Sequence, residues 1–503
     1  MRSLFYIGLT LLLPIFTLAQ TLNDVTYLTQ TNLSGTARYT SMAGAFGALG
    51  GDFSALNDNP AASSVFLNTE IGGTINFQAR NHTTDYLGSL AEKEDTGFYM
   101  DQFGAVFVFN NTKAESPWSR ISAAINVNRM ETFDQEASLF GTNTYGISDY
   151  FLFYADGIAF EDIQLYDEET IASVYQYLGD EIGFGAQQAF LGYQSFIIDP
   201  FTADPGETRY FSNVDSNQYQ HDLKIKNVGF HRKTSFNFST LYREILHLGV
   251  NVNSHYIEFD QTHDFFEGGQ DLDSFIYDVN FKNTLLSYGR GQSLQFGGIL
   301  KLNNLRLGLA YDSPQWIELQ DETKQSLSAY RFQDGIEIQE ILDPNVINSF
   351  ASYELKIPSK TSISAAYVFN SSGLLSFEYS TQDLSDSQSN SASGSNFLEA
   401  LNREIKDTFG IVNTLKVGGE LLIKELSLRA GYFNRSKMQN SSSLNDHAVT
   451  LGVGFDFGPS SLNFSLVNYT QIQEFQLFSE GLTGSFELSK KLTQVTMSFN
   501  FKL

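Results

Sequence analysis

The chain has 503 residues, and its 31 basic and 57 acidic side chains give a formal net charge of −26. It contains no Cys, which excludes disulfides, thiolate nucleophiles and iron–sulfur clusters, and the acidic balance disfavours nucleic acid as a partner. Aromatic residues make up 14% of the chain and charged residues only 17%, at a mean hydropathy of −0.19. This composition is typical of one large barrel whose strands have an apolar and a polar face.

Residues 1–19 have the layout of a secretory signal peptide. Arg2 gives a positive start, residues 4–16 form an apolar stretch, and Thr17-Leu18-Ala19 is a small-residue cleavage site. The alternative is a membrane anchor, but the apolar stretch is shorter than the roughly 20 residues that span a bilayer. We therefore expect export of a mature chain that begins at Gln20, either as a soluble β-protein or as a membrane barrel.

Residues 20–68 precede the first expected strand and are predicted to form a compact plug, or hatch. Small residues let backbones pack closely, and Asn-Pro enforces a turn. The candidate hatch residues are Gly50, Gly51, Asp52, Asn59, Pro60 and Ala61. We expect Gly50 and Gly51 to permit close approach to the barrel wall. The glycine spacing at 44–51 lacks both G-x-G-x-x-G and a Walker lysine, so a nucleotide site is not expected.

The rest of the chain is predicted to be strands that alternate apolar and polar residues. The pattern is clearest at 494–503, where apolar side chains occupy the odd positions. It predicts an even set of about fourteen strands, as bacterial barrels require. These lie near 71–78, 103–109, 120–129, 234–242, 245–258, 292–301, 305–313, 353–369, 373–381, 414–423, 426–434, 447–457, 461–471 and 493–503.

The lengths of the connections distinguish a membrane barrel from a soluble sandwich. Connections after even-numbered strands are short, apart from one longer turn at 110–119, whereas those after odd strands are long: 130–233, 259–291, 314–352, 382–413 and 472–492. Short periplasmic turns and long external loops produce this pattern, and a sandwich gives no reason for it. We predict an all-β, transmembrane antiparallel barrel over 69–503, with the hatch in its lumen and its last strand paired with its first. The largest external insertion is expected at 130–233.

The hatch sequence resembles a known family. Gly-Ala-Phe-Gly-Ala-Leu-Gly-Gly-Asp-Phe-Ser-Ala from residue 44, followed by Asn59-Pro60-Ala61, is similar to the N-terminal hatch of the FadL/OmpP1/TodX outer-membrane transporters. It resembles in particular their Bacteroidetes-type branch, sometimes labelled hemin receptors. The recognisable motif covers 35–66, and the remainder matches by length and strand rhythm.

The resemblance implies a place in the outer membrane of a Gram-negative bacterium. It also implies uptake of hydrophobic molecules such as long-chain fatty acids or aromatic hydrocarbons. External loops would capture the ligand, an apolar lumen site would bind it, and a shift of the hatch would release it, with lateral escape through a gap in the wall. The family would place capture mainly on later loops, whereas here the largest insertion follows the third strand.

Two groups of residues are candidates for ligand binding. Arg306, Arg429 and Lys301 share the parity of the lumen face, so one of them could bind a carboxylate headgroup, the alternative being a pair with Asp456 or a hatch carboxylate. Loop aromatics could supply an apolar capture surface, or could serve only for loop packing and interfacial girdles. These are Phe151, Phe153, Phe190, Phe196, Phe265 and Phe266.

Catalytic and metal motifs find little support. Neither G-x-S-x-G nor H-E-x-x-H occurs, so we expect no enzyme and no cofactor. His247, His255 and His263 are eight residues apart, which separates neighbours by roughly 26 Å on a strand, too far for one metal. Each is either a solvated lumen or loop histidine or, alternatively, a lone axial haem ligand. The acidic stretch 264–273 misses the EF-hand spacing and is either a calcium loop or a solvated one.

Two functions therefore remain. The first is transport of hydrophobic small molecules through a hatch-gated, monomeric barrel in contact with outer-membrane lipid. The second is a structural or accessory barrel subunit with protein partners in the outer membrane. A continuous apolar tunnel from loops to hatch would favour the transporter.

Overall fold

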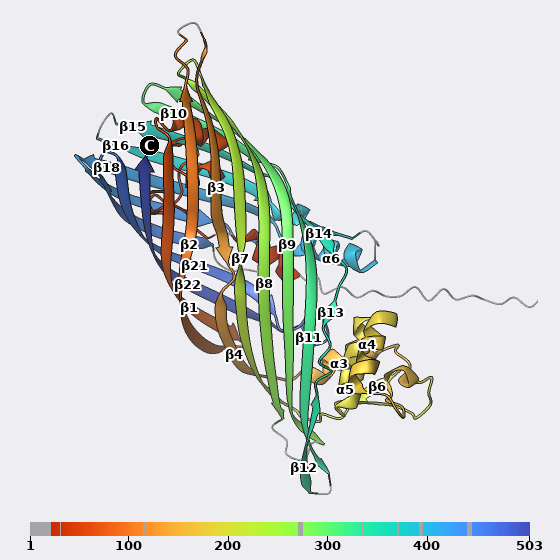
Figure 1. Ribbon diagram of the computed structural model, residues 1–503. Coiled ribbons are helices and arrows are strands. Elements are labelled where there is room, and N and C mark those ends of the chain that lie inside the picture. The colour runs from red at the N-terminus through yellow and green to blue at the C-terminus, as the bar shows by residue number, and fades with distance from the viewer. Residues whose placement is uncertain are drawn as a thin grey trace, which may run out of the picture.

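The computed structural model describes residues 22–30, 32–113, 116–269, 275–333, 335–369, 372–391, 396–439 and 445–503. The chain forms one antiparallel β-barrel around an N-terminal segment (Figure 1). The expected signal peptide at 1–19 lies outside the described residues.

The barrel wall is a closed ring of antiparallel strands in chain order. Its last strand pairs with its first, from Glu70 opposite Lys502 to Asp85 opposite Glu487. The predicted closed barrel of about fourteen strands is confirmed. The ring consists of β1 (Glu70–Tyr86), β2 (Ser89–Asn110), β3 (Trp118–Thr132), β7 (Tyr219–Tyr242), β8 (Leu246–Gly269), β9 (Ile276–Leu302), β10 (Leu305–Asp312), β15 (Lys360–Val368), β16 (Gly373–Asp383), β18 (Ile411–Ile423), β19 (Leu426–Arg435), β20 (Asp446–Asp456), β21 (Ser460–Gln476) and β22 (Ser485–Lys502).

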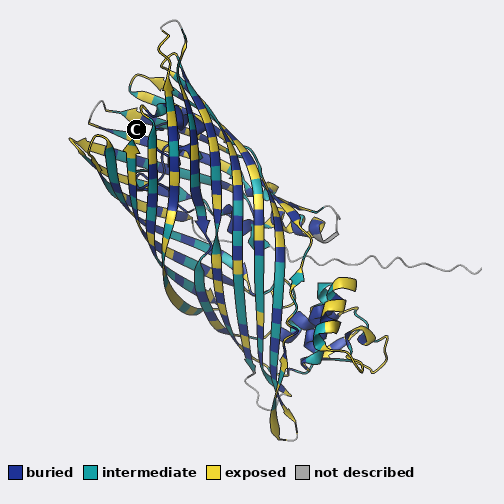
Figure 2. Cartoon of the chain, viewed as in Figure 1, coloured by how far each residue is buried: buried dark blue, intermediate teal, exposed yellow. Residues whose placement is uncertain are grey.

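The wall has apolar side chains outside and polar ones inside, the reverse of a water-soluble protein. On β22 the outward Val495, Phe499 and Phe501 are 45%, 50% and 41% exposed, while the inward Gln494 and Thr496 are fully buried. Buried and exposed residues alternate along the wall strands in the same way (Figure 2). An apolar outer surface of this kind is stable only against lipid.

Several strands continue far past the length that a bilayer requires. β7, β8 and β9 contain 24, 24 and 27 residues, whereas about 9 to 11 residues span a membrane. Other segments lengthen the wall or pair with these extensions: β4 (Gln135–Asn143), β11 (Gln315–Gln333), β12 (Ile336–Leu342), β13 (Asn348–Ser349), β14 (Tyr353–Ile357) and β17 (Gln388–Asn390).

The long connections predicted from sequence were therefore wrong in length. Most of 259–291 is the β8–β9 hairpin, and 314–352 contains β11, β12 and β13. Outside the membrane both faces of a strand can meet water, so the alternation that reveals a strand in the sequence weakens there.

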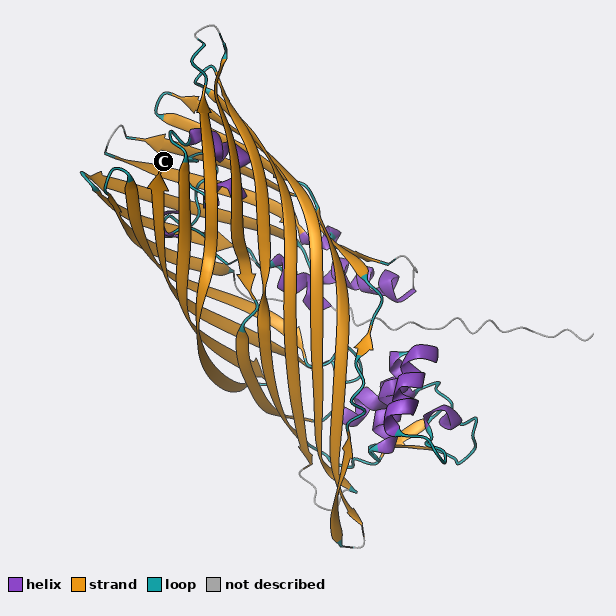
Figure 3. Ribbon diagram, viewed as in Figure 1, coloured by secondary structure: helices purple, strands orange, loops and turns teal. Residues whose placement is uncertain are grey.

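The large insertion begins later and ends earlier than the predicted 130–233, because β4 and the first half of β7 belong to the wall. The inserted part is 144–218. Figure 3 shows it as a group of helices at the end of the barrel opposite the C-terminus. It contains α3 (Ile147–Ala155), η3 (Phe160–Ile163), α4 (Ile171–Glu181), α5 (Phe184–Gln194), β5 (Ile198–Pro200) and β6 (Tyr210–Ser212).

The hatch is built from short helices between the N-terminal end of the described chain and β1. They are α1 (Leu22–Thr29), α2 (Ala37–Ser41), η1 (Ser54–Asn57) and η2 (Pro60–Val65). A further helix, α6 (Asn396–Thr408), and the turn η4 (Leu384–Asp386) lie after β16, and α6 contacts α1. Among the described residues, none of the helices has the length and apolarity needed to cross a membrane.

Candidate functional site

The hatch lies directly against the backbone of the wall. Eight wall strands carry a glycine that faces the hatch, and a Cβ at any of these glycines would come within 3 Å of a hatch atom. Here a missing side chain is what allows the hatch to fit. The eight residues, which we call the glycine ring, are Gly72, Gly104, Gly249, Gly297, Gly308, Gly418, Gly431 and Gly452.

Gly50 and Gly51 have a different role from the one expected. Both adopt positive φ, +62° and +65°. A Cβ on Gly50 would meet Val65 and Ala62, which are part of the hatch itself, and one on Gly51 would only touch Val65 at 3.5 Å. These glycines therefore shape a turn inside the hatch, and the glycines that permit approach to the wall are in the wall.

The Asn59-Pro60-Ala61 turn lies fully buried in the lumen. The side-chain oxygen of Asn59 accepts a hydrogen bond from the Ala61 N–H at 3.0 Å and so caps η2. Its Nδ2 donates to the carbonyls of Gly47 at 2.8 Å and Gly298 at 3.1 Å, which joins two hatch segments to β9. Asp52, also buried, accepts from the Thr36 hydroxyl and the Ser54 N–H.

Two buried ionic clusters fix the hatch to one side of the wall. Glu420 of β18 pairs with Arg38 of the hatch at 3.0 Å and with Arg429 of β19 at 2.6 Å. Lys416 of β18 pairs with Asp58 of the hatch at 3.1 Å and with Glu378 of β16 at 2.8 Å. Each hatch charge thus meets a wall group that has a second partner within the wall.

Of the three cations predicted to bind a ligand headgroup, two contact protein groups near the hatch and the third is exposed. Arg429 is held by Glu420, and Arg306 donates from Nη1 to the Leu49 carbonyl of the hatch at 2.7 Å. Lys301 is exposed near the turn that joins β9 to β10, and Asp456 pairs with Lys502. Within the described residues no ion pair joins Arg306, Arg429 or Lys301 to Asp456 or to a hatch carboxylate, so the expected alternative pairing is not seen, and the headgroup role stays a prediction.

An apolar core fills the lumen on the side of the hatch that faces the insertion. Tyr27 of α1 lies at its inner end, with ring centroids 4.8 Å from Phe259, 5.6 Å from Phe475 and 6.3 Å from Phe133. The core continues without a break from α1 to the helices of the insertion. We call the group of Tyr27, Phe133, Phe259 and Phe475 the Tyr27 cluster.

The predicted loop aromatics divide into two groups. Phe151, Phe190 and Phe265 are fully buried in this core, although Phe265 is on β8 rather than in a loop. Phe281 and Phe478, which the sequence analysis did not single out, link them: Phe151 is 5.4 Å from Phe281, and Phe265 is 5.2 Å from Phe478.

Phe153, Phe196 and Phe266 are instead partly exposed. The structure therefore joins only some of the predicted set into one apolar surface.

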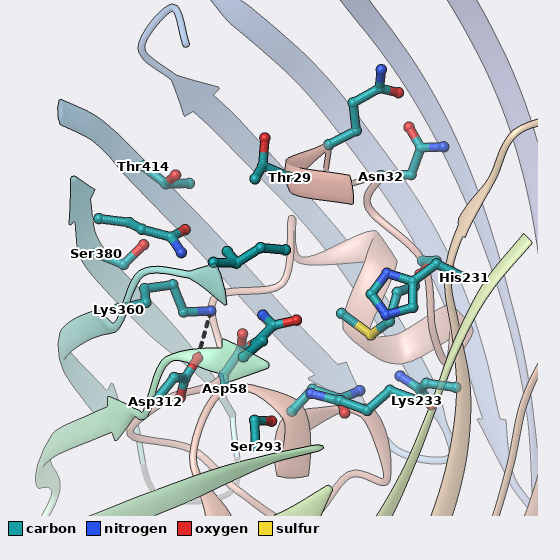
Figure 4. Close-up of a pocket in the computed structure, with 18 of the residues that line it drawn as sticks. Thr29, Asn32, Asp58, His231, Lys233, Ser293, Asp312, Lys360, Ser380 and Thr414 are labelled. Carbon is teal, nitrogen blue, oxygen red and sulfur yellow. Dashed lines mark ion pairs between the residues drawn. The ribbon is translucent and has the colours of Figure 1, made fainter. Parts of the chain in front are cut away.

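A polar cavity of about 150 Å³ lies between the hatch and the wall. Figure 4 shows His231 and Lys233 on one side of it and the Lys360–Asp312 ion pair, 3.0 Å long, on the other. His231 and His255 share a hydrogen bond of 2.9 Å, and His255 reaches Ser293 at 2.9 Å. This cavity was not predicted from the sequence, because Lys233 lies just before the strand predicted at 234–242.

The three histidines of the sequence analysis do not meet. His247 contacts the Ser64 hydroxyl at 2.8 Å, His255 lines the cavity, and His263 is half-buried at another level of β8. Within the described ranges no three His, Asp or Glu residues are grouped as a metal site would need. In the acidic stretch 264–273, Glu267 pairs with His221 at 3.0 Å, while Asp271 and Asp273 lie outside the described residues.

The wall ladder is interrupted beside the cavity. The β10–β15 pairing ends at Asp312 opposite Lys360, and the β11–β14 pairing begins at Gln315 opposite Ile357. Ser313-Pro314 and Pro358-Ser359 lie between them, and proline has no N–H to donate to a ladder. Ser313 and Pro358 both line the cavity.

The class that this fold defines is a transmembrane β-barrel closed by an N-terminal hatch. No family model and no curated protein sequence matches the chain. Among solved structures it is similar to a FadL homologue of Pseudomonas aeruginosa, with a TM-score of 0.52 at 13% identity, over 94% of this chain and 99% of that one. It is also similar to the toluene transporter TodX of P. putida, with a TM-score of 0.51 at 13% identity and the same coverage.

At this identity the likeness establishes the fold. The chain has the fold of the FadL and TodX structures, which confirms the predicted resemblance at that level. The Bacteroidetes-type and hemin-receptor labels stay predictions.

Proposed function

We propose that this protein transports hydrophobic small molecules across the outer membrane. One observation carries the proposal: an apolar core, packed with side chains rather than open as the expected tunnel, runs through the lumen from the insertion to α1 of the hatch. The neighbouring structures support it, since one is named a toluene transporter and another a FadL homologue. The lipid-facing wall supports the location.

Ligand uptake would begin where the insertion meets the wall. Phe265, Phe281 and Phe478 form an apolar surface there, against Tyr150 and Phe151 of α3. An apolar ligand that replaces side-chain contacts in this core loses no hydrogen bonds. It would pass inward to the Tyr27 cluster, where displacement of α1 would make room for it.

Release would take place through the wall. The glycine ring and the two ionic clusters hold the hatch across the lumen, so passage past it would require many contacts to break together. Residues 313–314 and 358–359 form no ladder pairs with each other, so a ligand could leave between them without breaking ladder hydrogen bonds. We assign the exit to this gap, which adjoins the polar cavity.

A reversible crosslink tests this route. Because the chain has no Cys, Ser313→Cys with Ser359→Cys would form its only disulfide, across the gap. Tyr311→Cys with Thr361→Cys is the matched control on the same two strands, where the ladder is intact. Uptake of radiolabelled toluene and of oleate by expressing cells would be compared in oxidised and reduced states.

Oxidation should reduce uptake in the gap variant at least fivefold and leave the control unchanged. If neither the wild type nor any variant takes up either compound, the transport function is rejected. Equal uptake in all states would keep transport and reject the gap as the exit.

In the alternative function, an accessory subunit of a larger assembly, the insertion would be the surface that binds the partner. In residues 144–218 Arg209 is the one basic side chain among many acidic ones, and Tyr145, Phe153 and Phe201 are exposed. Deletion of 144–218 distinguishes the two functions. A stoichiometric membrane partner that is lost on deletion, with no hydrophobic uptake by the full chain, would favour the subunit.

A further inference from the structure

The polar cavity contains a buried cation that lacks a partner. Lys233 is only 7% exposed, and among the described residues no acceptor lies within hydrogen-bonding distance of its Nζ. It projects from β7 into the lumen, opposite His255 in the β7–β8 register. A buried ammonium without a direct ion pair is unfavourable, and in membrane proteins such a group marks a candidate ligand site.

The other lysines of the cavity are already paired with carboxylates. Lys360 pairs with Asp312, and Lys416 pairs with both Asp58 and Glu378. Arg435 donates to the Thr29 carbonyl at 2.9 Å and lies opposite the buried Asp446 in the β19–β20 ladder. Among the described residues Lys233 is therefore the one lysine of the lining without an ion pair, and the buried Nη1 of Arg435, which has no partner, is a second donor that an anion could meet.

The rest of the lining is suited to a hydrophilic molecule. Amide and hydroxyl side chains are the most numerous, among them Asn253, Ser293, Gln295 and Thr414, although Leu28, Leu33, Met130, Ile357 and Val412 also line the cavity. An alkyl tail would leave these polar groups without partners, which costs free energy. Asp58 and Asp312, also in the lining, would repel a second negative charge on the ligand.

We propose that the cavity binds a small hydrophilic carboxylate. Its single charge pairs with the Lys233 ammonium, and its hydroxyl groups exchange hydrogen bonds with the surrounding amides and hydroxyls. The chemistry differs from that of the apolar core, and the proposal does not depend on hydrophobic transport.

Three six-carbon probes separate the elements of recognition. Gluconate has the carboxylate and the hydroxyls, glucitol keeps the hydroxyls without the charge, and hexanoate keeps the charge without the hydroxyls. Binding to the detergent-purified full chain would be measured by calorimetry after long equilibration, because the hatch covers the cavity. Gluconate should bind at least tenfold more tightly than either analogue.

Lys233→Met keeps the aliphatic stem and removes the charge. It should weaken gluconate binding at least tenfold and, without ligand, raise the unfolding temperature, because an uncompensated buried charge is gone. Lys226→Met is the matched control, since Lys226 is on the same strand with its side chain exposed. The control should bind as the wild type does, and barrel closure of both is checked by heat-dependent gel mobility.

The proposal is overturned if the wild type binds no gluconate, binds glucitol or hexanoate as tightly, or loses gluconate to an equal concentration of chloride. It is also overturned if Lys233→Met binds gluconate as the wild type does. Should Lys233→Met fail to close, the three probes on the wild type decide alone.

Discussion

Asn59 of the hatch and Gly297 of β9 are in direct contact, and a β-carbon at Gly297 would overlap the Asn59 side-chain oxygen. The same oxygen caps η2 through the Ala61 N–H. The Asn59-Pro60-Ala61 turn of the hatch therefore fits against β9 only because residue 297 has no side chain.

Gly297→Ala should loosen the hatch. The added methyl group must push Asn59 and Pro60 away, an overpacking that costs about 1 to 3 kcal/mol. The variant should show larger ion conductance in planar bilayers. Gly298→Ala is the control, because its β-carbon would point outward with no atom nearer than 3.6 Å. Equal conductance of the two variants would contradict a sealing role for the glycine ring.

Glu420→Gln should weaken the attachment of the hatch to the wall more strongly than Gly297→Ala does. The substitution leaves the Arg38 and Arg429 guanidinium groups without their shared carboxylate. Breaking a buried ion pair by removing one partner costs about 3 to 5 kcal/mol. Amide hydrogen exchange should rise across residues 36–58 and stay unchanged in β1 and β22. Glu425→Gln, in an exposed turn, should change neither, and a uniform rise would instead indicate loss of the whole barrel.

Tyr27→Ala should free α1 without opening the barrel. The ring contacts Phe259, Phe475 and Phe133, and loss of a large buried side chain costs roughly 3 kcal/mol. Amide exchange should increase over residues 22–30. Tyr27→Phe keeps the ring and should preserve most of the protection, whereas unaltered exchange in Tyr27→Ala would show that other contacts hold α1.

A chain that lacks residues 20–66 should still close as a barrel. Every wall strand pairs only with wall strands, and Glu420–Arg429 and Lys416–Glu378 survive as ion pairs within the wall. The product should be an open, ion-conducting pore with the heat-dependent mobility of a folded barrel. Failure to fold would mean that the hatch is required for closure.

The parts of the fold that face lipid could be predicted closely from the sequence. Strand β20 was expected at 447–457 and spans Asp446–Asp456, because lipid requires apolar residues at every second position. Strand β8 was expected to end at 258 but continues to Gly269, where Gln261 and Asp264 no longer alternate clearly with apolar residues.

The candidate site was harder to predict. Lys233 precedes the strand predicted at 234–242. Its importance depends on the cavity around it, where the nearby carboxylates already pair with other lysines. The wall glycines that contact the hatch are scattered over 72–452 and share no local motif. Gly50 and Gly51 are adjacent in a recognisable sequence, yet their close contacts are within the hatch. Long-range contacts of this kind have no periodic signal in the chain.

The glycine ring also restricts the order in which the molecule can be assembled. The hatch leads directly into β1, which pairs on both sides, with β2 and with the last strand, β22. Once that final seam forms, a segment that touches eight strands at backbone distance has no lateral route into the lumen. The N-terminal residues, synthesised first, must therefore already lie inside the ring when the C-terminal strand closes it. The hatch is in the lumen before the barrel is complete.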